Sequence, residues 1–304
     1  MEPMIVNTKD LYFSFKAGQP ILNGINMQVP KGSIYGFLGP NGAGKTTTLR
    51  LLLGLLNNQK GDIKIFGQDF FKNRIEILKR VGSLIEQPSL YLHLTGVENL
   101  EIYRLVYGCT KQRVSEVLEI VGLTTALKKK AKQYSLGMKQ RLAIAIALLH
   151  QPEFLILDEP TNGLDPNGII ETRELIKKLN KEFGTTVLVS SHILAEVEKM
   201  ATHVGIIHKG NLLFQGTLSE LQHMQSTKSS LEIETNDNEK ASALLGKDFA
   251  VSITDAKIIL PYQSKEQSGV INRRLIENGL DVYTIHPQHN DLEQLFMDIT
   301  SNGK

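Results

Sequence analysis

The sequence has one cysteine, Cys109, in 304 residues. A single cysteine excludes an internal disulfide and is typical of a protein from a reducing cytosol. Long apolar runs are also lacking, since the longest extend only from Leu49 to Leu56 and from Leu142 to Leu149. Both are far shorter than the roughly 18–20 residues that cross a bilayer. If this protein works at a membrane, we expect another chain to supply the membrane part.

A strong charge of one sign is missing as well. The formal net charge is +2, which is too small to indicate a nucleic-acid partner. The start, Met1-Glu2-Pro3, has no basic region followed by an apolar stretch, so we expect no targeting signal. With 41% hydrophobic and 22% charged residues, the composition is that of a soluble globular protein. Its length suffices for a domain of ordinary size and a smaller one.

What the sequence does contain is a phosphate-binding loop. The pattern G-x-x-x-x-G-K-[ST] is matched over Gly39-Pro40-Asn41-Gly42-Ala43-Gly44-Lys45-Thr46. An apolar run, 33–38, precedes the loop, and leucines at helical spacing follow it. Glycines let consecutive N–H groups cradle phosphates, while Lys45 suits the β/γ oxygens and Thr46 suits Mg²⁺. This context disfavours a glycine-rich turn without a ligand, and the predicted nucleotide-binding set is these eight residues and Thr47.

Two carboxylates follow a second apolar run. The stretch from Phe154 to Asp158 predicts a buried parallel strand, and Glu159 comes directly after it. In open α/β sheets ligands collect at the carboxyl ends of strands. Asp158 suits Mg²⁺ binding, and Glu159 suits general-base work on an attacking water. Alone, such a strand end is more often a solvated turn, but the phosphate loop in the same chain reverses that preference.

A second anion site is predicted at the start of an apolar helix, in Tyr134-Ser135-Leu136-Gly137-Met138. Ser135 can cap the first turn, and Gly137 leaves the backbone bare. Together with the loop and the carboxylates, this stretch resembles the nucleotide-binding subunit of ATP-binding-cassette (ABC) transporters, over about residues 4–220. The family has Leu-Ser-Gly-Gly-Gln here, so Leu136 and Met138 depart from it. We expect the function of the signature to be retained, with weaker or altered binding of the γ-phosphate.

Four further positions carry the resemblance. Gln87 matches the Q-loop, Asp165 ends the D-loop motif Asn-Gly-Leu-Asp, and His192 matches the switch histidine. Phe15 matches the aromatic residue that stacks on adenine, with Tyr12 as a substitute. Each has a plainer interpretation, since Gln87 can be loop polarity, His192 can be structural and Phe15 can belong to the core.

The resemblance implies the cofactors ATP and Mg²⁺ and a division of roles. The implied catalytic residues are Glu159, His192 and Gln87, and the implied Mg²⁺ ligands are Thr46, Gln87 and Asp158. In this family two cassettes pair head to tail, as a homodimer or with a second cassette. Ser135, Gly137 and Asp165 would then act on the ATP of the partner subunit.

The family also implies a separate transmembrane permease as partner and no nucleic acid. The chain would sit peripherally on the cytoplasmic face of the membrane, and Gln87 would face the permease. The alternatives are a soluble ABC-type ATPase acting on nucleic acid or the ribosome, and a non-hydrolysing regulatory module. The single cassette and its compact helical segment argue against the ATPase that acts on nucleic acid or the ribosome. Glu159 and His192 argue against the regulatory module.

The predicted fold class is α/β, an ABC ATPase core with a mainly parallel sheet over residues 1–222. A helical subdomain over about 93–152 carries the signature. A helix opens at Asp165-Pro166 and ends at Gly184, with Ile169, Thr172, Ile176, Leu179 and Phe183 on one face. The C-terminal tail and the signature sequence resemble those of one branch of the family. That branch includes the ATPase subunits of bacitracin-resistance and lantibiotic-immunity exporters.

A polar stretch near 223–230 predicts a linker, and residues 231–304 predict a small α+β accessory domain. Its expected elements are a strand from Leu231, a hairpin over 249–262 turning near Asp255-Ala256, a helix ending at Gly279 and a strand over 280–285. A last helix would be capped near Asn290, with Leu292, Leu295, Phe296 and Ile299 on one face.

Overall fold

The computed structural model describes residues 3–16, 18–86, 89–226, 230–254 and 257–288. The chain divides into two compact units, the first ending at Leu218 and the second beginning at Ser219. Helix α8 (Leu218–Ser226) begins at this boundary. Among the helices of the described ranges, none combines the length and the apolar character needed to cross a bilayer.

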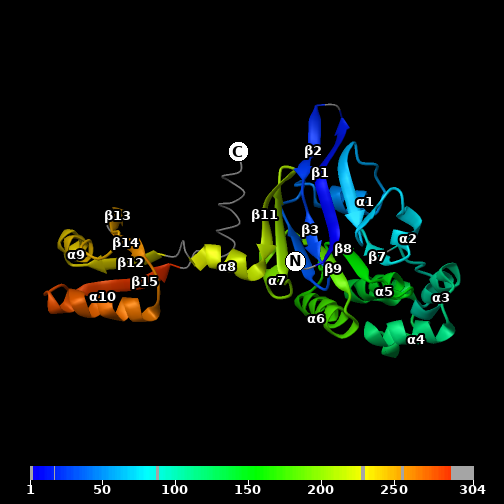
Figure 1. Cartoon of the computed structure of the whole chain (residues 1–304). Coiled ribbons are helices and arrows are strands. Elements are labelled where there is room, and N and C mark those ends of the chain that lie inside the picture. Colours follow the sequence, from blue (N-terminus) through cyan, green and yellow to red (C-terminus); the bar gives the residue numbers. More distant parts are fainter. Residues whose placement is uncertain (1–2, 17, 87–88, 227–229, 255–256, 289–304) are drawn as a thin grey trace. The chain divides into compact units, whose positions relative to one another are not determined.

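A large sheet forms the centre of the first unit (Figure 1). It has six strands in the order β11-β10-β4-β9-β8-β7. The strands are β4 (Ile34–Leu38), β7 (Val81–Leu84), β8 (Phe154–Asp158), β9 (Thr186–Ser191), β10 (His203–His208) and β11 (Asn211–Thr217). All neighbours pair in parallel except β10 and β11. Every residue of β4, β8 and β9 is buried, as expected for parallel strands covered on both faces.

An antiparallel sheet lies beside it and contains β1 (Met4–Lys16), β2 (Gln19–Ile25), β3 (Gln28–Pro30), β5 (Lys60–Ile65) and β6 (Gln68–Asp69). Helix α1 (Lys45–Leu52) follows β4 directly after the glycine-rich loop. Its Leu49 and Leu52 belong to the same buried cluster as Val6 of β1 and Phe37 of β4. The core therefore holds the loop between two sheets. The short helix α2 (Arg74–Leu78) leads into β7.

Three helices lie together at one side of the first unit (Figure 1). They are α3 (Gly96–Tyr107), α4 (Lys111–Ile120) and α5 (Leu136–Leu148), with 3₁₀ turns η1 (Thr124–Ala126) and η2 (Ala131–Gln133) between the last two. Thr95 caps α3 in a capping box with Glu98, and Gly108 ends the helix at φ 68°. Thr110 caps α4, and Ser135 caps α5.

Helix α6 (Pro166–Phe183) starts and ends at the predicted residues. Asp165 is its N-cap, and Gly184 ends it in the left-handed conformation at φ 66°. Thr172, Ile176 and Leu179 are buried as predicted, but Phe183 is 51% exposed, because it lies in the last turn beyond the packed part of the helix. The short helix α7 (Leu194–Glu198) follows β9.

The second unit has the order β-α-β-β-α-β. Its elements are β12 (Ser230–Thr235), α9 (Asn238–Leu245), β13 (Ser252–Thr254), β14 (Lys257–Pro261), α10 (Lys265–Glu277) and β15 (Val282–Gln288). The sheet order β13-β14-β12-β15, antiparallel throughout, is the split β-α-β arrangement of ferredoxin-like folds. Leu231, Ile233, Leu245, Ile258 and Leu275 form its core.

Several elements of this unit follow the sequence pattern. The predicted hairpin is β13 paired with β14, while its turn, Asp255-Ala256, lies outside the described residues. The last strand starts at Val282, two residues later than predicted. Helix α9 was not predicted, since its eight residues show too short an apolar pattern. The predicted helix with Leu292, Leu295, Phe296 and Ile299, and its cap Asn290, also lies outside the described residues.

Candidate functional site

The glycine-rich loop joins the carboxyl end of β4 to the first turn of α1. Gly42 and Gly44 have φ values of 80° and 111°, which L side chains rarely adopt. A Cβ on Gly44 would lie 2.6 Å from Leu22 Cδ2, so a side chain does not fit there. These glycines let the loop close around a ligand with its amides turned inward.

Lys45 is folded back over this loop. Its ammonium is buried, with 6% of the side chain exposed, and donates to the carbonyl oxygens of Gly39 at 2.6 Å and Pro40 at 3.3 Å. Its Nζ also lies 3.2 Å from Glu159 Oε1. The ammonium group of Lys45 therefore lies at the opening of the loop, where it would contact an anion bound by the loop amides.

Thr46 and Asp158 meet although they are far apart in the sequence. Thr46 Oγ1 donates to Asp158 Oδ2 at 2.8 Å, and Ser190 Oγ donates to Asp158 Oδ1 at 2.5 Å. Asp158 is buried at the end of β8, and Thr46 lies in the first turn of α1. A hydroxyl and a carboxylate oxygen are hard ligands of the kind that Mg²⁺ takes.

Glu159 lies between the loop and the neighbouring strand β9. Its backbone has φ 47°, a left-handed conformation for a residue other than glycine. Its Oε2 lies 2.8 Å from His192 Nδ1, and its Oε1 faces Lys45. Within the described residues Oε1 is buried and makes no hydrogen bond of good geometry, but its charge is paired with Lys45, so this oxygen faces the phosphate loop.

Phe15 borders a cavity of about 260 Å³ next to the loop. The cavity is lined by Phe15, Ile21, Pro40, Asn41, Gly42, Gly44, Lys45, Thr46, Thr47 and Glu159. Phe15 is 60% exposed and packs edge-on against Phe13 at 4.8 Å between ring centroids. The core interpretation of Phe15 is therefore wrong. Tyr12 is not part of this lining and instead lies under Lys60 Nζ, 5.7 Å from its ring centroid.

Ser135, Gly137 and Asp165 lie at helix starts. Ser135 Oγ accepts from Met138 N at 3.2 Å, which confirms the predicted cap of α5. Asp165 Oδ1 accepts from Gly168 N at 3.2 Å. Gly137 has open space, since the nearest atom to an added Cβ is 3.8 Å away. Among the described residues, none of the three hydrogen-bonds to Lys45, Asp158 or Glu159.

A hollow of about 410 Å³ nevertheless connects the carboxylates to the start of the signature helix. Its lining residues are Thr46, Glu86, Leu136, Gln140, Asp158, Glu159, Asn162 and Gly163. Glu86 has φ 62° and pairs with Arg50 of α1. Gln87 comes next in the chain but lies outside the described residues.

Sequence reasoning missed two side chains of this region. Ser190 joins Asp158 to the backbone N–H of Glu159, at 2.5 and 2.9 Å. Thr161 donates to the carboxylate of Glu196, which ties the segment after Glu159 to α7. Polar residues at the carboxyl end of a buried strand, as in Ser190-Ser191-His192, were the available signal for the first.

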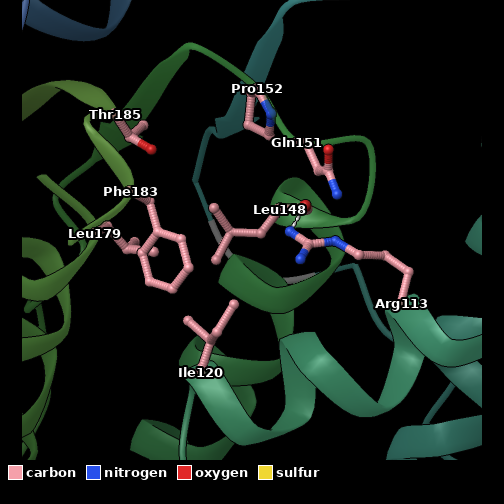
Figure 2. A pocket seen from close by; sticks show the side chains of 8 residues that line it. All are labelled: Arg113, Ile120, Leu148, Gln151, Pro152, Leu179, Phe183 and Thr185. Atoms are coloured by element: carbon pink, nitrogen blue, oxygen red, sulfur yellow. Dashed lines mark hydrogen bonds between the residues drawn. The ribbon is translucent and has the colours of Figure 1, made fainter.

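A second cavity, of about 360 Å³, lies by the amino ends of β8 and β9, which Pro152 and Thr185 precede (Figure 2). Leu148, Leu179 and Phe183 contribute apolar side chains to its wall. Arg113 donates from Nη2 to Leu148 O at 2.9 Å and from Nε to Leu149 O at 3.3 Å. It thus satisfies carbonyls at the end of α5. None of the catalytic, nucleotide-binding or metal-binding residues predicted from the sequence is in the lining of this cavity.

Known proteins resemble this chain over most of its length. The family model described as "ABC transporter" matches residues 22–162. The chain is 46% identical to the bacitracin transport ATP-binding protein BcrA of Bacillus licheniformis over 303 residues, which cover 98% of each chain. It is 45% identical over 195 residues to the lantibiotic transport ATP-binding protein SrtF of Streptococcus pyogenes, covering 64% of this chain and 83% of SrtF.

Among solved structures, a dimeric structure of the ATP-binding cassette MJ0796 bound to ADP and Pi is similar, with a TM-score of 0.63 and 27% identity. The match covers 70% of this chain and 98% of that chain. The predicted resemblance and fold class are confirmed, whereas the nucleic-acid alternative finds no support in these relatives. The chain belongs to the ABC transporter family, as one of its ATP-binding proteins.

Proposed function

We propose that this chain hydrolyses ATP to energise a separate membrane permease that exports a peptide antibiotic of the bacitracin or lantibiotic kind. One observation carries the proposal: the buried Lys45, the Thr46–Asp158 pair and the Glu159–His192 pair converge beside one glycine-rich loop. The class of cargo is suggested by the transport names of BcrA and SrtF.

The roles of the residues follow from their chemistry. The loop over 39–44 and Lys45 would hold the β/γ phosphates, while Phe15 would stack on the adenine at the open side of the cavity. Thr46 and Asp158 fit Mg²⁺, because they present two hard oxygens 2.8 Å apart at the end of the loop. Mg²⁺ would supply charge neutralisation for the phosphates.

Glu159 is the proposed general base. Its Oε1 pairs with the ammonium of Lys45, and therefore lies beside the place where the terminal phosphate would be held. His192 would hold the other oxygen, Oε2, and so fix the direction of the carboxylate. This arrangement lets Glu159 accept the proton of a water that attacks the phosphate.

Ser135, Gly137 and Asp165 are proposed to act on ATP bound to the partner subunit in a head-to-tail pair. The capped start of α5 offers backbone N–H groups and an uncrowded glycine, which suits a phosphate supplied by another chain. Gln87 is proposed to bind Mg²⁺ and to face the permease. The chain would then lie peripherally on the cytoplasmic face of the membrane.

The domain limits are also a proposal. Residues 1–222 would form the nucleotide-binding domain, with the helical subdomain over about 93–152. Residues 231–304 would form an accessory domain without a catalytic role. The compact core of the second unit, which includes Leu231 and Leu275, supports its independence as a folding unit.

The proposed function is tested in cells that carry the permease genes but lack this chain. Wild-type protein should restore resistance to bacitracin or to a lantibiotic, and Lys45→Ala should not, although it is made in equal amounts. Resistance restored equally by both would show that ATP turnover at this site does not drive export. No change in resistance with wild type would reject this class of cargo.

The trans role of Ser135 is tested with two heterodimers. In the first, one chain carries Lys45→Ala and the other Ser135→Arg, so head-to-tail pairing places both lesions in one site. In the second, both changes are in one chain and each site has a lesion. Residual ATPase activity is expected only in the first. Activity confined to the second would contradict the trans role.

A further inference from the structure

Ser190 occupies a singular position between the two carboxylates of the site. It lies near the end of β9, fully buried, and is the register partner of Asp158 on β8. Its Oγ donates to Asp158 Oδ1 at 2.5 Å and accepts from the backbone N–H of Glu159 at 2.9 Å. One hydroxyl thus touches the proposed metal ligand and the proposed base together.

The direction of the Ser190 hydroxyl is determined by its partners. A serine hydroxyl has one proton to donate and can accept with its lone pairs. The amide of Glu159 can only donate, so the proton of Ser190 points at Asp158. The bond to Asp158 is buried and the bond from Glu159 is partly buried, which strengthens both relative to bonds in water.

The two bonds fix two different things. On Asp158, Ser190 donates a hydrogen bond to Oδ1 and Thr46 donates one to Oδ2. The two bonds together fix the orientation of the carboxylate plane. On Glu159, the bond holds the amide of a residue at φ 47°, a backbone conformation that non-glycine residues rarely adopt. That conformation aims the side chain at Lys45 and His192.

We propose that Ser190 is a positioning residue for ATP hydrolysis, which sets the orientation of Asp158 and the backbone of Glu159 relative to each other. The inference rests on the proposed roles of Asp158 and Glu159. Ser190 itself does not touch Lys45 or the loop in the described structure, so it should affect turnover more than nucleotide capture.

The test uses Ser190→Ala in the purified full chain. We expect kcat for ATP to fall about 10–100-fold, the usual effect of removing a partner that orients a ligand. KM and the Kd of a non-hydrolysable ATP analogue, measured by calorimetry, should change less than about threefold, because the phosphate loop is untouched. The affinity for Mn²⁺ in the presence of the analogue, measured by electron paramagnetic resonance, should weaken.

Ser33→Ala is the matched control. Ser33 is also buried, and its Oγ donates to Pro30 O at 2.7 Å, away from both carboxylates. It should leave kcat and Mn²⁺ affinity within about twofold. If Ser190→Ala does not fold, Ser190→Cys provides a slightly larger side chain of the same shape that is only a weak hydrogen-bond donor, and kcat should still fall at least about tenfold.

A folded Ser190 variant with kcat and Mn²⁺ affinity within about twofold of wild type would overturn the proposal. So would a loss of kcat matched by an equal loss of analogue affinity, since that indicates general damage. Glu159→Gln is run in parallel. If it keeps full activity, the proposed role of Glu159 as base fails, and with it the premise for Ser190; if it is inactive while Ser190→Ala keeps wild-type activity, only the role of Ser190 fails.

Discussion

The two edges of the six-stranded sheet each hold a hollow and a well-covered cation, yet they differ in what surrounds the cation. At the carboxyl edge Lys45 faces a carboxylate and a glycine-rich loop. At the amino edge the guanidinium of Arg113, with 14% of the side chain exposed, satisfies the last carbonyls of α5. The hollows at the carboxyl edge measure about 260 and 410 Å³ and the one at the amino edge about 360 Å³, so size alone does not locate the chemistry.

Left-handed backbone conformations occur at both edges. At the carboxyl edge Glu159 takes a left-handed conformation that is retained because several contacts hold it. At the amino edge Gln151, at φ 55°, and Gly184, at φ 66°, are also left-handed, and Gly184 ends a helix. The comparison teaches that a left-handed non-glycine residue does not by itself locate the chemistry, whereas the polar groups that converge on Glu159 do.

The largest expected effect contrasts two glutamates at the two ends of β8. Glu159→Gln should lower kcat by about 10²–10⁴, or about 3–5 kcal/mol of barrier, because the base is lost. Glu153→Gln, just before the same strand, removes an exposed pair with Arg80 and should leave kcat within twofold. Steady-state ATPase assays measure both. Equal activity of Glu159→Gln and wild type would remove the base from the mechanism.

The next contrast uses the same substitution at two glycines. Gly44→Ala should weaken ATP binding at least about tenfold, because its Cβ would meet Leu22 Cδ2 and Ile21 O in a φ 111° conformation. Gly184→Ala at φ 66° has open space and should cost about 1–2 kcal/mol of unfolding free energy with ATP binding intact. Calorimetry and urea unfolding separate these. Similar ATP affinities in both variants would erase the distinction between the edges.

A third change tests the amino edge by itself. Arg113→Ala should lower the free energy of unfolding by about 1–3 kcal/mol, because Leu148 O and Leu149 O lose a charged donor. The kcat should change less than twofold. Lys111→Ala, an exposed position on the same helix, is the control and should change stability little. A large loss of kcat in Arg113→Ala would mean that the two edges are coupled.

The smallest effect is a pH dependence at the amino edge. The hydrogen bond from Arg80 lowers the pKa of Glu153 below its ordinary value of about 4.5. The Arg80–Glu153 pair therefore stabilises the folded protein above about pH 4.5. This stabilisation is lost as the pH falls through the lowered pKa of Glu153. Since both side chains are well exposed, Glu153→Gln should cost only about 0.2–1 kcal/mol at pH 7, and less near pH 3. A difference in unfolding free energy that grows in acid would contradict the pairing.

Much of the carboxyl edge could be predicted because its signals are local. The phosphate loop is eight consecutive residues, and Asp158 with Glu159 ends an apolar run. Likewise, Asp165 and Gly184 mark the limits of α6, since capping depends on neighbours within one turn. Helix α9 was missed because a short amphipathic stretch is shaped more by the sheet it covers than by its own pattern.

The sequence by itself determined the phosphate loop, the acidic strand end, the capped signature helix and the family. Only the tertiary structure decided that Phe15 is exposed beside the loop, that Thr46 bonds to Asp158, and that Ser190 lies between both carboxylates. These contacts join residues more than thirty positions apart. The contacts of Ser190 depend on the register of β8 against β9, which is set by packing across the sheet and has no local sequence signature.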